Sequence, residues 1–237
     1  MLGTLIRKSS QTLFDLLYPP RCIYCDASQE WLCSICQDKI PLILADICQQ
    51  CGTPINTSVP CNQCRRHPLY HVDGIRVMAY YEDSPLRSAI HTFKYNNQKV
   101  LAATLAEMLA QTYSRYALEA DVIVPVPLHR SRFKERGYNQ SELLARQLAT
   151  ILTLPVNTST LKRARKTQIQ MSLGADERKK NVSGAFVCQD KSLANQNVLL
   201  IDDVCTTGST LDACAASLKQ TKVASVWGLT LAKPANL

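Results

Sequence analysis

The stretch VLLIDDVCTTGSTL, residues 198–211, combines two kinds of side chain that could bind one ligand. Asp202 and Asp203 follow an aliphatic run, and a carboxylate pair at the end of a buried strand needs hydroxyl, metal or basic partners. The TTGST that follows can fold into a turn whose backbone N–H groups meet a phosphate at a helix start. Gly208 permits close approach of the backbone. Acceptors for a diol and donors for a phosphate are together the requirements of a ribose 5-phosphate.

Other phosphate-binding motifs fit these residues less well. A Walker A loop needs a Lys before its Ser or Thr, and this stretch contains no Lys. The Rossmann pattern G-x-G-x-x-G is also absent from the sequence. An acidic pair of the receiver-domain type would explain IDD but gives no reason for TTGST. An ordinary strand followed by a capped helix is the remaining structural alternative.

Eight of the 11 cysteines form four C-x-x-C pairs. Two such turns can hold one Zn²⁺ in a tetrahedral site, so four pairs predict two structural zinc sites. We expect the pairs to combine in chain order, although the spacing also permits an interleaved arrangement. The expected ligands are Cys22, Cys25, Cys33 and Cys36 in one site and Cys48, Cys51, Cys61 and Cys64 in the other.

Disulfides and thioredoxin-like redox motifs are the alternatives for these pairs. The N-terminal residues show no clear secretory signal, and a cytosolic chain keeps its thiols reduced. A redox C-x-x-C normally occurs once, at a helix start. Zinc is therefore favoured, and metal should supply much of the folding energy of this segment. His67 and His71 are expected at the surface, Cys188 and Cys214 in the core, and Cys205 lies within the acidic and hydroxyl stretch.

Strands and helices alternate after the cysteine pairs. We expect strands at residues 75–81, 121–126, 197–201 and 224–231, and helices at residues 85–95, 100–118, 141–151 and 209–219. Ser141 is the expected cap of its helix. The alternation predicts an α/β fold with a parallel sheet flanked by helices, in which ligands bind at the carboxyl ends of strands. We expect a small Cys-rich zinc-ribbon domain over residues 1–70 and the α/β domain over residues 71–237.

Charge and hydropathy narrow the choice of partner. The net charge is +8, and basic residues cluster at 130–136 and 162–180, which favours nucleic acid, anionic lipid or a phosphorylated small molecule. The apolar runs are too short to predict a membrane span. Leu5, Leu13, Leu16 and Leu17 fit a short amphipathic helix, for which packing on the protein is favoured over membrane docking. We expect a cytoplasmic protein.

The stretch VLLIDDVCTTGSTL resembles the phosphoribosyl pyrophosphate (PRPP) loop of type I phosphoribosyltransferases. The resemblance implies that Asp202 and Asp203 hold the ribose hydroxyls and that the loop amides hold the 5-phosphate. The loop residues concerned are Thr206, Thr207, Gly208, Ser209 and Thr210.

Two further stretches resemble loops of the same family. VIVPVPLHRSRFKERGYNQSELLA (122–145) resembles the pyrophosphate loop, and LKRARKTQIQMSLGADERKKNVSGAF (161–186) resembles the mobile catalytic loop. Either stretch by itself fits a solvated basic loop equally well, but the three in order indicate the family. The pyrophosphate-loop residues are Pro127, Leu128, His129, Arg132 and Arg136. The mobile-loop residues are Arg163, Arg165, Gln170 and Arg178.

Together with the cysteine pairs, these stretches resemble the ComF/GntX family, whose members are linked to the uptake of DNA for natural transformation. The resemblance implies PRPP binding with Mg²⁺ and attack of an acceptor on C1 through an oxocarbenium-like state. Asp203 and Arg165 are the residues that we expect to matter most for catalysis. The family resemblance also suggests a competence helicase as a partner.

Two other functions fit the same residues. The first is a factor that binds single-stranded DNA, with Trp31, Tyr24 and Tyr70 available for stacking on bases. Of the 27 Lys and Arg, only six lie in residues 1–72 against five Asp and Glu, so a basic surface must lie mainly on the remainder. The second is a regulator that binds a nucleotide effector without turnover.

Overall fold

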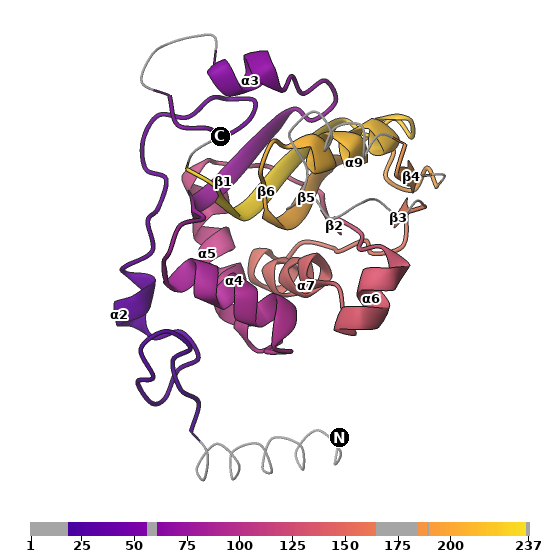
Figure 1. Ribbon diagram of the computed structural model, residues 1–237. Helices are drawn as coiled ribbons and strands as arrows, with labels where there is room; N and C mark the ends of the chain where they lie inside the picture. The colour runs from indigo at the N-terminus through magenta and orange to yellow at the C-terminus, as the bar shows by residue number, and fades with distance from the viewer. Residues whose placement is uncertain (1–18, 56–60, 165–183, 189, 236–237) are drawn as a thin grey trace.

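The computed structural model describes residues 19–55, 61–164, 184–188 and 190–235 (Figure 1). The leucines of the expected N-terminal amphipathic helix lie outside these residues. So do three residues of the expected mobile loop, Arg165, Gln170 and Arg178.

Four parallel strands form the central sheet in the order β1-β6-β5-β2. Their bounds are β1 (Gly74–Tyr80), β2 (Val122–Pro125), β5 (Asn197–Val204) and β6 (Ser225–Lys233). The parallel α/β sheet predicted from the alternating pattern is therefore confirmed. Strand β5 continues past its expected end at residue 201 because its backbone stays paired with β6, with Asp202 opposite Thr230.

Both faces of the sheet are buried, as in parallel sheets generally. Helices α4 (Pro85–Tyr95), α5 (Leu101–Arg115) and α7 (Gln140–Leu152) cover one face, and α9 (Ser209–Lys219) covers the other (Figure 1). Successive strand residues point to opposite faces. Leu199 and Ile201 accordingly pack in the core with α5 and α7, whereas Val198 and Leu200 pack in the core with α9.

Local side chains determine where two of the helices begin. Ser84 accepts a hydrogen bond from the N–H of Arg87 at 3.4 Å, and Pro85 occupies the first turn of α4. Helix α7 begins at Gln140, and its cap is Asn139, whose Oδ1 accepts the N–H of Ser141 at 3.1 Å. The prediction of Ser141 as the cap is therefore wrong. Because Ser141 lies inside the first turn, its hydroxyl can bond across to another element.

The structure contains short elements that the sequence pattern did not predict. The expected pyrophosphate loop includes helix α6 (Arg130–Arg136), which ends at Gly137 with φ of 81°. The ends of the expected mobile loop form an antiparallel ribbon of β3 (Leu161–Arg163) and β4 (Phe186–Cys188). Runs of three strand residues are too short to show a period, and seven helical residues rich in charge show no apolar face.

The Cys-rich segment packs against both faces of the sheet. It contains α2 (Ser34–Gln37) and α3 (Asn62–Arg66). Between these helices the chain runs beside the edge strand β1, where Ile43 N–H donates to the Met78 carbonyl at 2.9 Å. Cys36 is buried in the core that includes α4 and α5, and Cys51 in the core that includes α9. The segment thus shares both cores, and a domain boundary at residue 70 stays a prediction.

Candidate functional site

The carboxyl ends of β2 and β5 form a switch point of the sheet. After β2 the chain returns through α7 and pairs Val156 with Ile123 on the outer side of β2. After β5 it passes through α9 and joins β6 on the opposite side. Open α/β sheets bind ligands at such points. The N–H of Val126 donates to the Ile201 carbonyl at 2.9 Å, which holds the loop after β2 beside the end of β5.

The loop after β5 and one of the two carboxylates line the same small pocket. Within the described residues, the N–H groups of Thr206 and Thr207 have no hydrogen-bond acceptor, which leaves them available to an anion. The Thr207 and Ser209 hydroxyls are hydrogen-bonded to each other at 2.8 Å. The pocket is lined by Asp202, Val204, Cys205, Thr206, Gly208, Ser209, Thr210 and Leu211.

Gly208 is required by the backbone of this loop. Its φ is +83°, in the left-handed region, and it precedes the first residue of α9. A Cβ here would lie 2.9 Å from Ile75 Cδ1 and 3.1 Å from Leu69 Cδ1. The loop therefore lies directly on these two side chains, as close as only a glycine allows.

The two adjacent carboxylates have different surroundings. Asp202 Oδ1 accepts the Ser141 hydroxyl at 2.9 Å, and Asp202 lines the pocket. Asp203 is buried, and its Oδ2 lies 2.5 Å from Lys94 Nζ, on the face of the sheet that carries α4. The alternation of side chains along a strand sends the two neighbours to different sides. Asp202 is thus the carboxylate that a ligand in this pocket meets directly.

Burial and charge set the protonation of these groups. Burial and the adjacent Asp203 carboxylate raise the pKa of Asp202 to about 7. Burial lowers the pKa of Lys94, but the Asp203 and Asp202 carboxylates outweigh it, so that the pKa of Lys94 is raised and its ammonium stays charged. A cation or a hydrogen-bond donor brought to the pocket would favour the ionised form of Asp202.

Lys94 was not among the site residues selected from the sequence. It lies at the end of α4, 109 positions before its partner Asp203. Its signal in the sequence is a lysine within FKYNNQ, at the end of the amphipathic pattern of residues 85–95. Nothing in that pattern indicates a buried partner, since the pairing depends on how α4 packs on the sheet.

The expected pyrophosphate-loop residues are held by local bonds. His129 caps α6, and its Nδ1 accepts the Ser131 N–H at 3.2 Å. Arg136 donates to Gln140 Oε1 and lies over the Tyr95 ring, 5.3 Å from its centroid. Pro127, Leu128 and Arg132 are half-buried, and Arg132 has no hydrogen-bond or ion-pair partner among the described residues.

Arg163, on β3, is close enough to Asp202 and Arg132 to interact with both electrostatically. Burial lowers the pKa of Arg163, with nearby Arg132 adding to this shift and Cys214 and Asp202 opposing it. Its guanidinium lies 5.2 Å from the centroid of the Phe186 ring. Three separate segments therefore bring two cations and a carboxylate to the switch point, and two neighbouring cations favour an anionic ligand.

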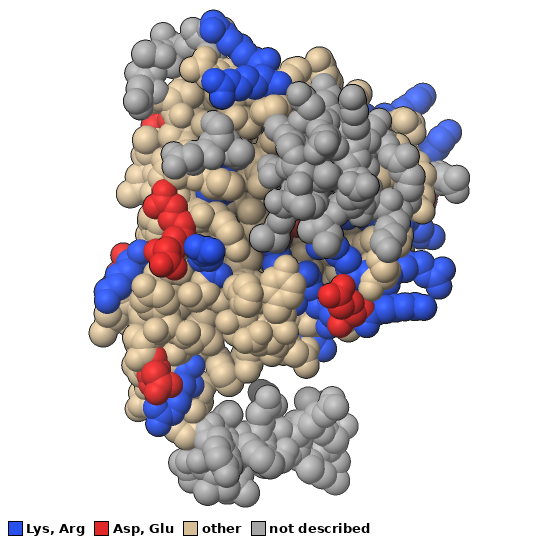
Figure 2. All heavy atoms as spheres, viewed as in Figure 1, with Lys and Arg blue, Asp and Glu red and all other residues tan. Residues whose placement is uncertain are grey.

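Basic side chains also gather outside the pocket. Figure 2 shows Lys and Arg along the side of the molecule where Figure 1 places α6 and β3. The exposed members on these two elements are Arg130, Lys134 and Lys162. Phe133 lies among them with 47% of its surface exposed.

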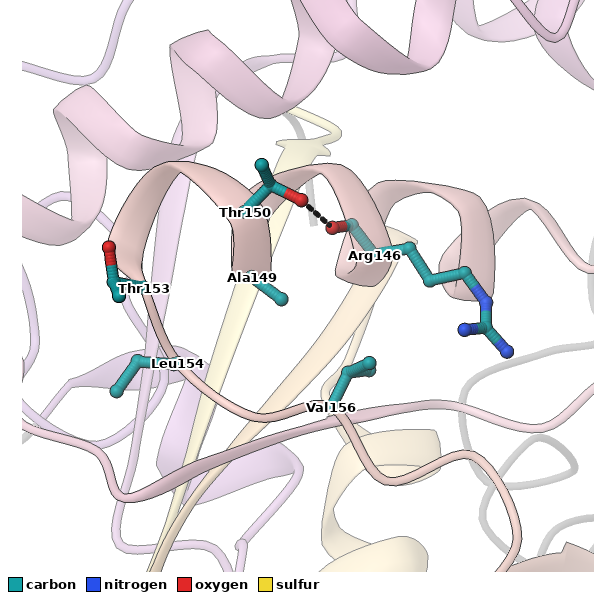
Figure 3. Close-up of a pocket in the computed structure, with 6 residues that line it drawn as sticks. All are labelled: Arg146, Ala149, Thr150, Thr153, Leu154 and Val156. Carbon is teal, nitrogen blue, oxygen red and sulfur yellow. Dashed lines mark hydrogen bonds between the residues drawn. The ribbon is translucent and has the colours of Figure 1, made fainter. Parts of the chain in front are cut away.

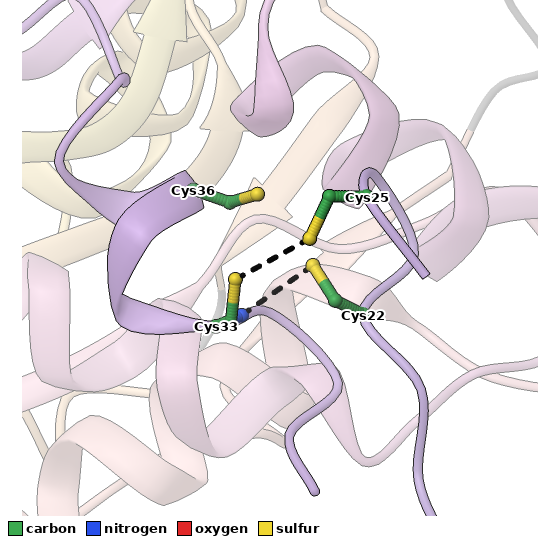
Figure 4. Close-up of side chains that lie close together, drawn as sticks. All are labelled: Cys22, Cys25, Cys33 and Cys36. Carbon is green, nitrogen blue, oxygen red and sulfur yellow. Dashed lines mark hydrogen bonds between the residues drawn. The ribbon is translucent and has the colours of Figure 1, made fainter. Parts of the chain in front are cut away.

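The eight paired cysteines form two clusters in chain order, as expected. Within each cluster the four sulfurs lie within 4.8 Å of one another. Figure 4 shows the sulfurs of the first cluster converging, with Cys25 Sγ 3.6 Å from Cys33 Sγ. In the second, Cys51 Sγ lies 3.7 Å from Cys61 Sγ. A tetrahedral Zn²⁺ with Zn–S distances of about 2.3 Å separates its sulfurs by about 3.8 Å, so both clusters fit structural zinc.

The remaining singled-out residues are placed as follows. Cys188 and Cys214 are buried, as expected, and burial raises the pKa of the buried Cys205 thiol to about 12, which keeps it unreactive. His71 is exposed and His67 is half-buried, and neither belongs to a cysteine cluster.

A second hollow lies at the far end of α7 (Figure 3). Its lining is Arg146, Ala149, Thr150, Thr153, Leu154 and Val156. Arg146 is paired with Glu142 at 2.8 Å, and the Thr150 hydroxyl donates to the Arg146 carbonyl. The hollow lacks converging polar groups and lies away from the switch point, so we assign it no function. No helix in the described part of the chain has the length and apolar character that crossing a bilayer requires.

Comparison with known families agrees with this architecture. Residues 13–65 match the double zinc ribbon domain, and residues 91–235 match the phosphoribosyl transferase domain. The fold and the site thus define a protein with a phosphoribosyltransferase domain preceded by a double zinc ribbon.

Three relatives align with most of this chain. Competence protein F of Haemophilus influenzae is 34% identical over 229 residues, which cover 90% of this chain and 97% of that protein. The DNA utilization protein YhgH of Escherichia coli is 32% identical over 202 residues, covering 82% and 87%. Competence protein ComFC of Bacillus subtilis is 28% identical over 218 residues, covering 89% and 88%. The chain therefore belongs to the ComF/GntX family.

Proposed function

We propose that the protein binds PRPP at the loop after β5 and acts in DNA uptake or utilization, the role for which its relatives are named. The observation that carries the proposal is that Asp202 and the TTGST loop line one pocket at the switch point of the sheet. Asp202 would accept hydrogen bonds from the ribose hydroxyls. The free N–H groups of Thr206 and Thr207, at the start of α9, would donate to the 5-phosphate.

The cations near the pocket would bind the pyrophosphate. Arg132 and Arg163 would stabilise the negative charge that develops as the bond between C1 and the pyrophosphate oxygen breaks. Mg²⁺ usually binds to one or two carboxylates together with substrate phosphates, and the Asp202 carboxylate fits that donor set. Asp203, which is ion-paired with Lys94, would help to keep the neighbouring Asp202 in position. Its catalytic role and that of Arg165 stay predictions, as does transfer to an acceptor.

Replacing Asp202 with Asn is expected to weaken PRPP binding at least about tenfold. A hydrogen bond to a charged group contributes about 1.5–3 kcal/mol, and each 1.4 kcal/mol is about tenfold in affinity. Calorimetric titration with PRPP and Mg²⁺ measures the effect. Asp190→Asn is the matched control, because Asp190 is exposed and its carboxylate bonds only Ser192 among the described residues. Equal affinity in wild type and Asp202→Asn would contradict the assignment.

Pyrophosphate release separates an enzyme from a regulator. The protein is incubated with PRPP, Mg²⁺ and candidate acceptors, and free pyrophosphate is followed with time. Release that depends on an acceptor supports phosphoribosyl transfer. Saturable PRPP binding without release supports the regulatory alternative.

A specific surface also favours binding of single-stranded DNA. Helix α6 exposes Arg130, Phe133 and Lys134 on one element, and Tyr95 is 55% exposed beside Arg136. Cations with exposed aromatic rings between them suit a strand whose bases stack while its phosphates are neutralised. This surface differs from the one expected from the sequence, where Tyr24 and Tyr70 are exposed but Trp31 packs partly against the core.

The DNA surface is tested with a fluorescent oligothymidine. Binding should weaken steeply with added salt, and Phe133→Ala should cost about 1–3 kcal/mol, the usual effect of losing one stacked base. Tyr24→Ala is the control, since Tyr24 is 47% exposed on the nearly neutral Cys-rich segment. An affinity for the oligothymidine that does not change with salt would count against this surface. So would an equal loss of affinity in Phe133→Ala and Tyr24→Ala.

Location and protein partners extend the proposal. We place the protein in the cytoplasm because reduced, metal-binding thiols are typical of that compartment. A competence helicase is the partner that family resemblance suggests, and no surface is assigned to it.

A further inference from the structure

One carboxylate anchors the segment that follows the second cysteine cluster (Cys48, Cys51, Cys61 and Cys64) to the helix of the PRPP loop. Asp212 lies in the first turn of α9, and its Oδ1 accepts the N–H groups of Tyr70, His71 and Val72 at 2.9, 2.7 and 3.1 Å. Hydrogen bonds to a charged acceptor are about twice as strong as neutral ones. The anchored segment, residues 69–72, is called the strap below.

The strap also contacts the second cluster and the loop itself. Gln50, which lies between Cys48 and Cys51, donates from Nε2 to the Leu69 carbonyl at 2.6 Å. The Leu69 side chain lies against Gly208, so close that a Cβ on Gly208 would come within 3.1 Å of Leu69 Cδ1. A continuous series of contacts therefore runs from the cluster through the strap to the loop.

A second route joins the same two places through β6. The Thr53 hydroxyl is hydrogen-bonded to Cys51 Sγ at 3.1 Å and to Lys233 Nζ. Lys233 is buried at the end of β6, and the preceding carbonyl of Ala232 accepts the N–H of Cys205 at 2.8 Å. Cys205 lines the ligand pocket. The backbone on both sides of the loop is thus tied to the second cluster.

Two buried cations indicate that this cluster is anionic when folded. Arg76 donates to the carbonyl and the side chain of Gln49, both at 2.8 Å, and its guanidinium lies over the rings of Tyr116 and Trp227. Among the described residues, neither Arg76 nor Lys233 has a carboxylate partner. Buried charges need a counter-charge, and four thiolates around Zn²⁺ supply a net negative charge beside them.

We propose that the second cluster positions the PRPP loop, with Asp212 and the strap as the positioning residues, so that zinc in the cluster and ligand in the pocket stabilise each other. The ligand part of this inference rests on the proposed function. Linkage requires the coupling to be reciprocal: if metal improves ligand binding, ligand must improve metal retention by the same factor. The first cluster is an internal control, because it packs in the opposite core with α4 and α5.

The test measures zinc release from each cluster in the intact protein. The zinc-loaded chain is treated with a zinc-selective chelator and N-ethylmaleimide, with excess Mg²⁺ and with or without PRPP. Peptide mapping by mass spectrometry then gives the rate of alkylation at each cysteine. We expect PRPP to slow alkylation of the second cluster at least about fivefold, the lower end of the usual range for coupled sites, and to leave the first cluster unchanged.

Variants of Asp212 test whether the coupling depends on its contact with the strap. Asp212→Ala should speed alkylation of the second cluster without ligand and reduce its protection by PRPP, and Asp212→Asn, which keeps an acceptor oxygen, should restore most of both. Asp121→Ala is the matched control, since Asp121 accepts the Asn197 N–H at 2.7 Å at the amino end of β5. It should leave both clusters unchanged.

The outcomes separate this inference from the proposed function. If calorimetry shows PRPP binding but PRPP protects both clusters equally or neither, the coupling is refuted and the ligand assignment stands. If PRPP does not bind, the proposed function fails. The rates of cysteine alkylation without PRPP then test whether the strap positions the second cluster. Faster alkylation confined to the second cluster in Asp212→Ala then supports the strap, and rates equal to those of Asp121→Ala overturn it.

Discussion

Removing zinc from the intact protein is expected to lower its stability by at least about 3 kcal/mol. Structural Zn²⁺ contributes about 10–16 kcal/mol of apparent binding free energy in isolated zinc-finger peptides, and packing can replace only part of this. Cys22, Cys33 and Cys36 are buried in the core that includes α4 and α5. Without metal these thiols lose the ion that joins them, and the Cys-rich segment loses the bonds that close its turns.

Thermal unfolding measures this effect. For a chain of this size, about 3 kcal/mol corresponds to a fall of about 6–12 °C in melting temperature, and adding zinc back should restore the original value. Cys36→Ser and Cys188→Ser are a matched pair, because both cysteines are buried and only Cys36 belongs to a cluster. Cys36→Ser should lose the zinc of its own cluster, whereas Cys188→Ser should retain all of it. A melting temperature that stays the same after zinc is removed with a chelator would disprove a structural role for the metal.

Replacing Lys94 with Met is expected to destabilise the protein by about 3–5 kcal/mol. Asp203 is buried, and its Oδ2 lies 2.5 Å from the Lys94 ammonium. Removing one partner of a buried ion pair leaves an uncompensated charge, and the cost is usually of this size. The double variant Lys94→Met/Asp203→Asn should be more stable than Lys94→Met by itself, because the orphaned charge is gone.

Chemical denaturation of a matched pair measures this difference. Lys219 and Asp73 also form an ion pair, at 2.7 Å, but about a third of each side chain is exposed. Lys219→Met should therefore cost no more than about 1 kcal/mol, as surface pairs do. If Lys94→Met is as mild as Lys219→Met, the pair with Asp203 is not a buried ion pair in solution.

Local pattern was enough to predict much of the framework. The parallel sheet was predicted from apolar runs that alternate with segments of helical periodicity. A strand buried on both faces gives a continuous apolar run, and a helix buried on one face gives apolar residues at helical spacing. The grouping of the eight cysteines followed from C-x-x-C spacing, because a turn of that length brings two sulfurs to one point. The TTGST loop was recognisable for a similar reason: a tight turn with positive φ at Gly208 needs particular residues in a fixed order.

Partners far apart in the chain were decided by the tertiary structure. Which carboxylate lines the pocket depends on β5 continuing past residue 201 and on α4 bringing Lys94 to Asp203. The anchoring of residues 70–72 by Asp212 joins positions about 140 residues apart. The sequence by itself determined the four strands of the central sheet, the cysteine clusters and the turn that suits a phosphate, because each is a property of neighbouring residues. Packing decided which charges meet, because a buried carboxylate takes whichever cation or N–H group the fold brings within reach.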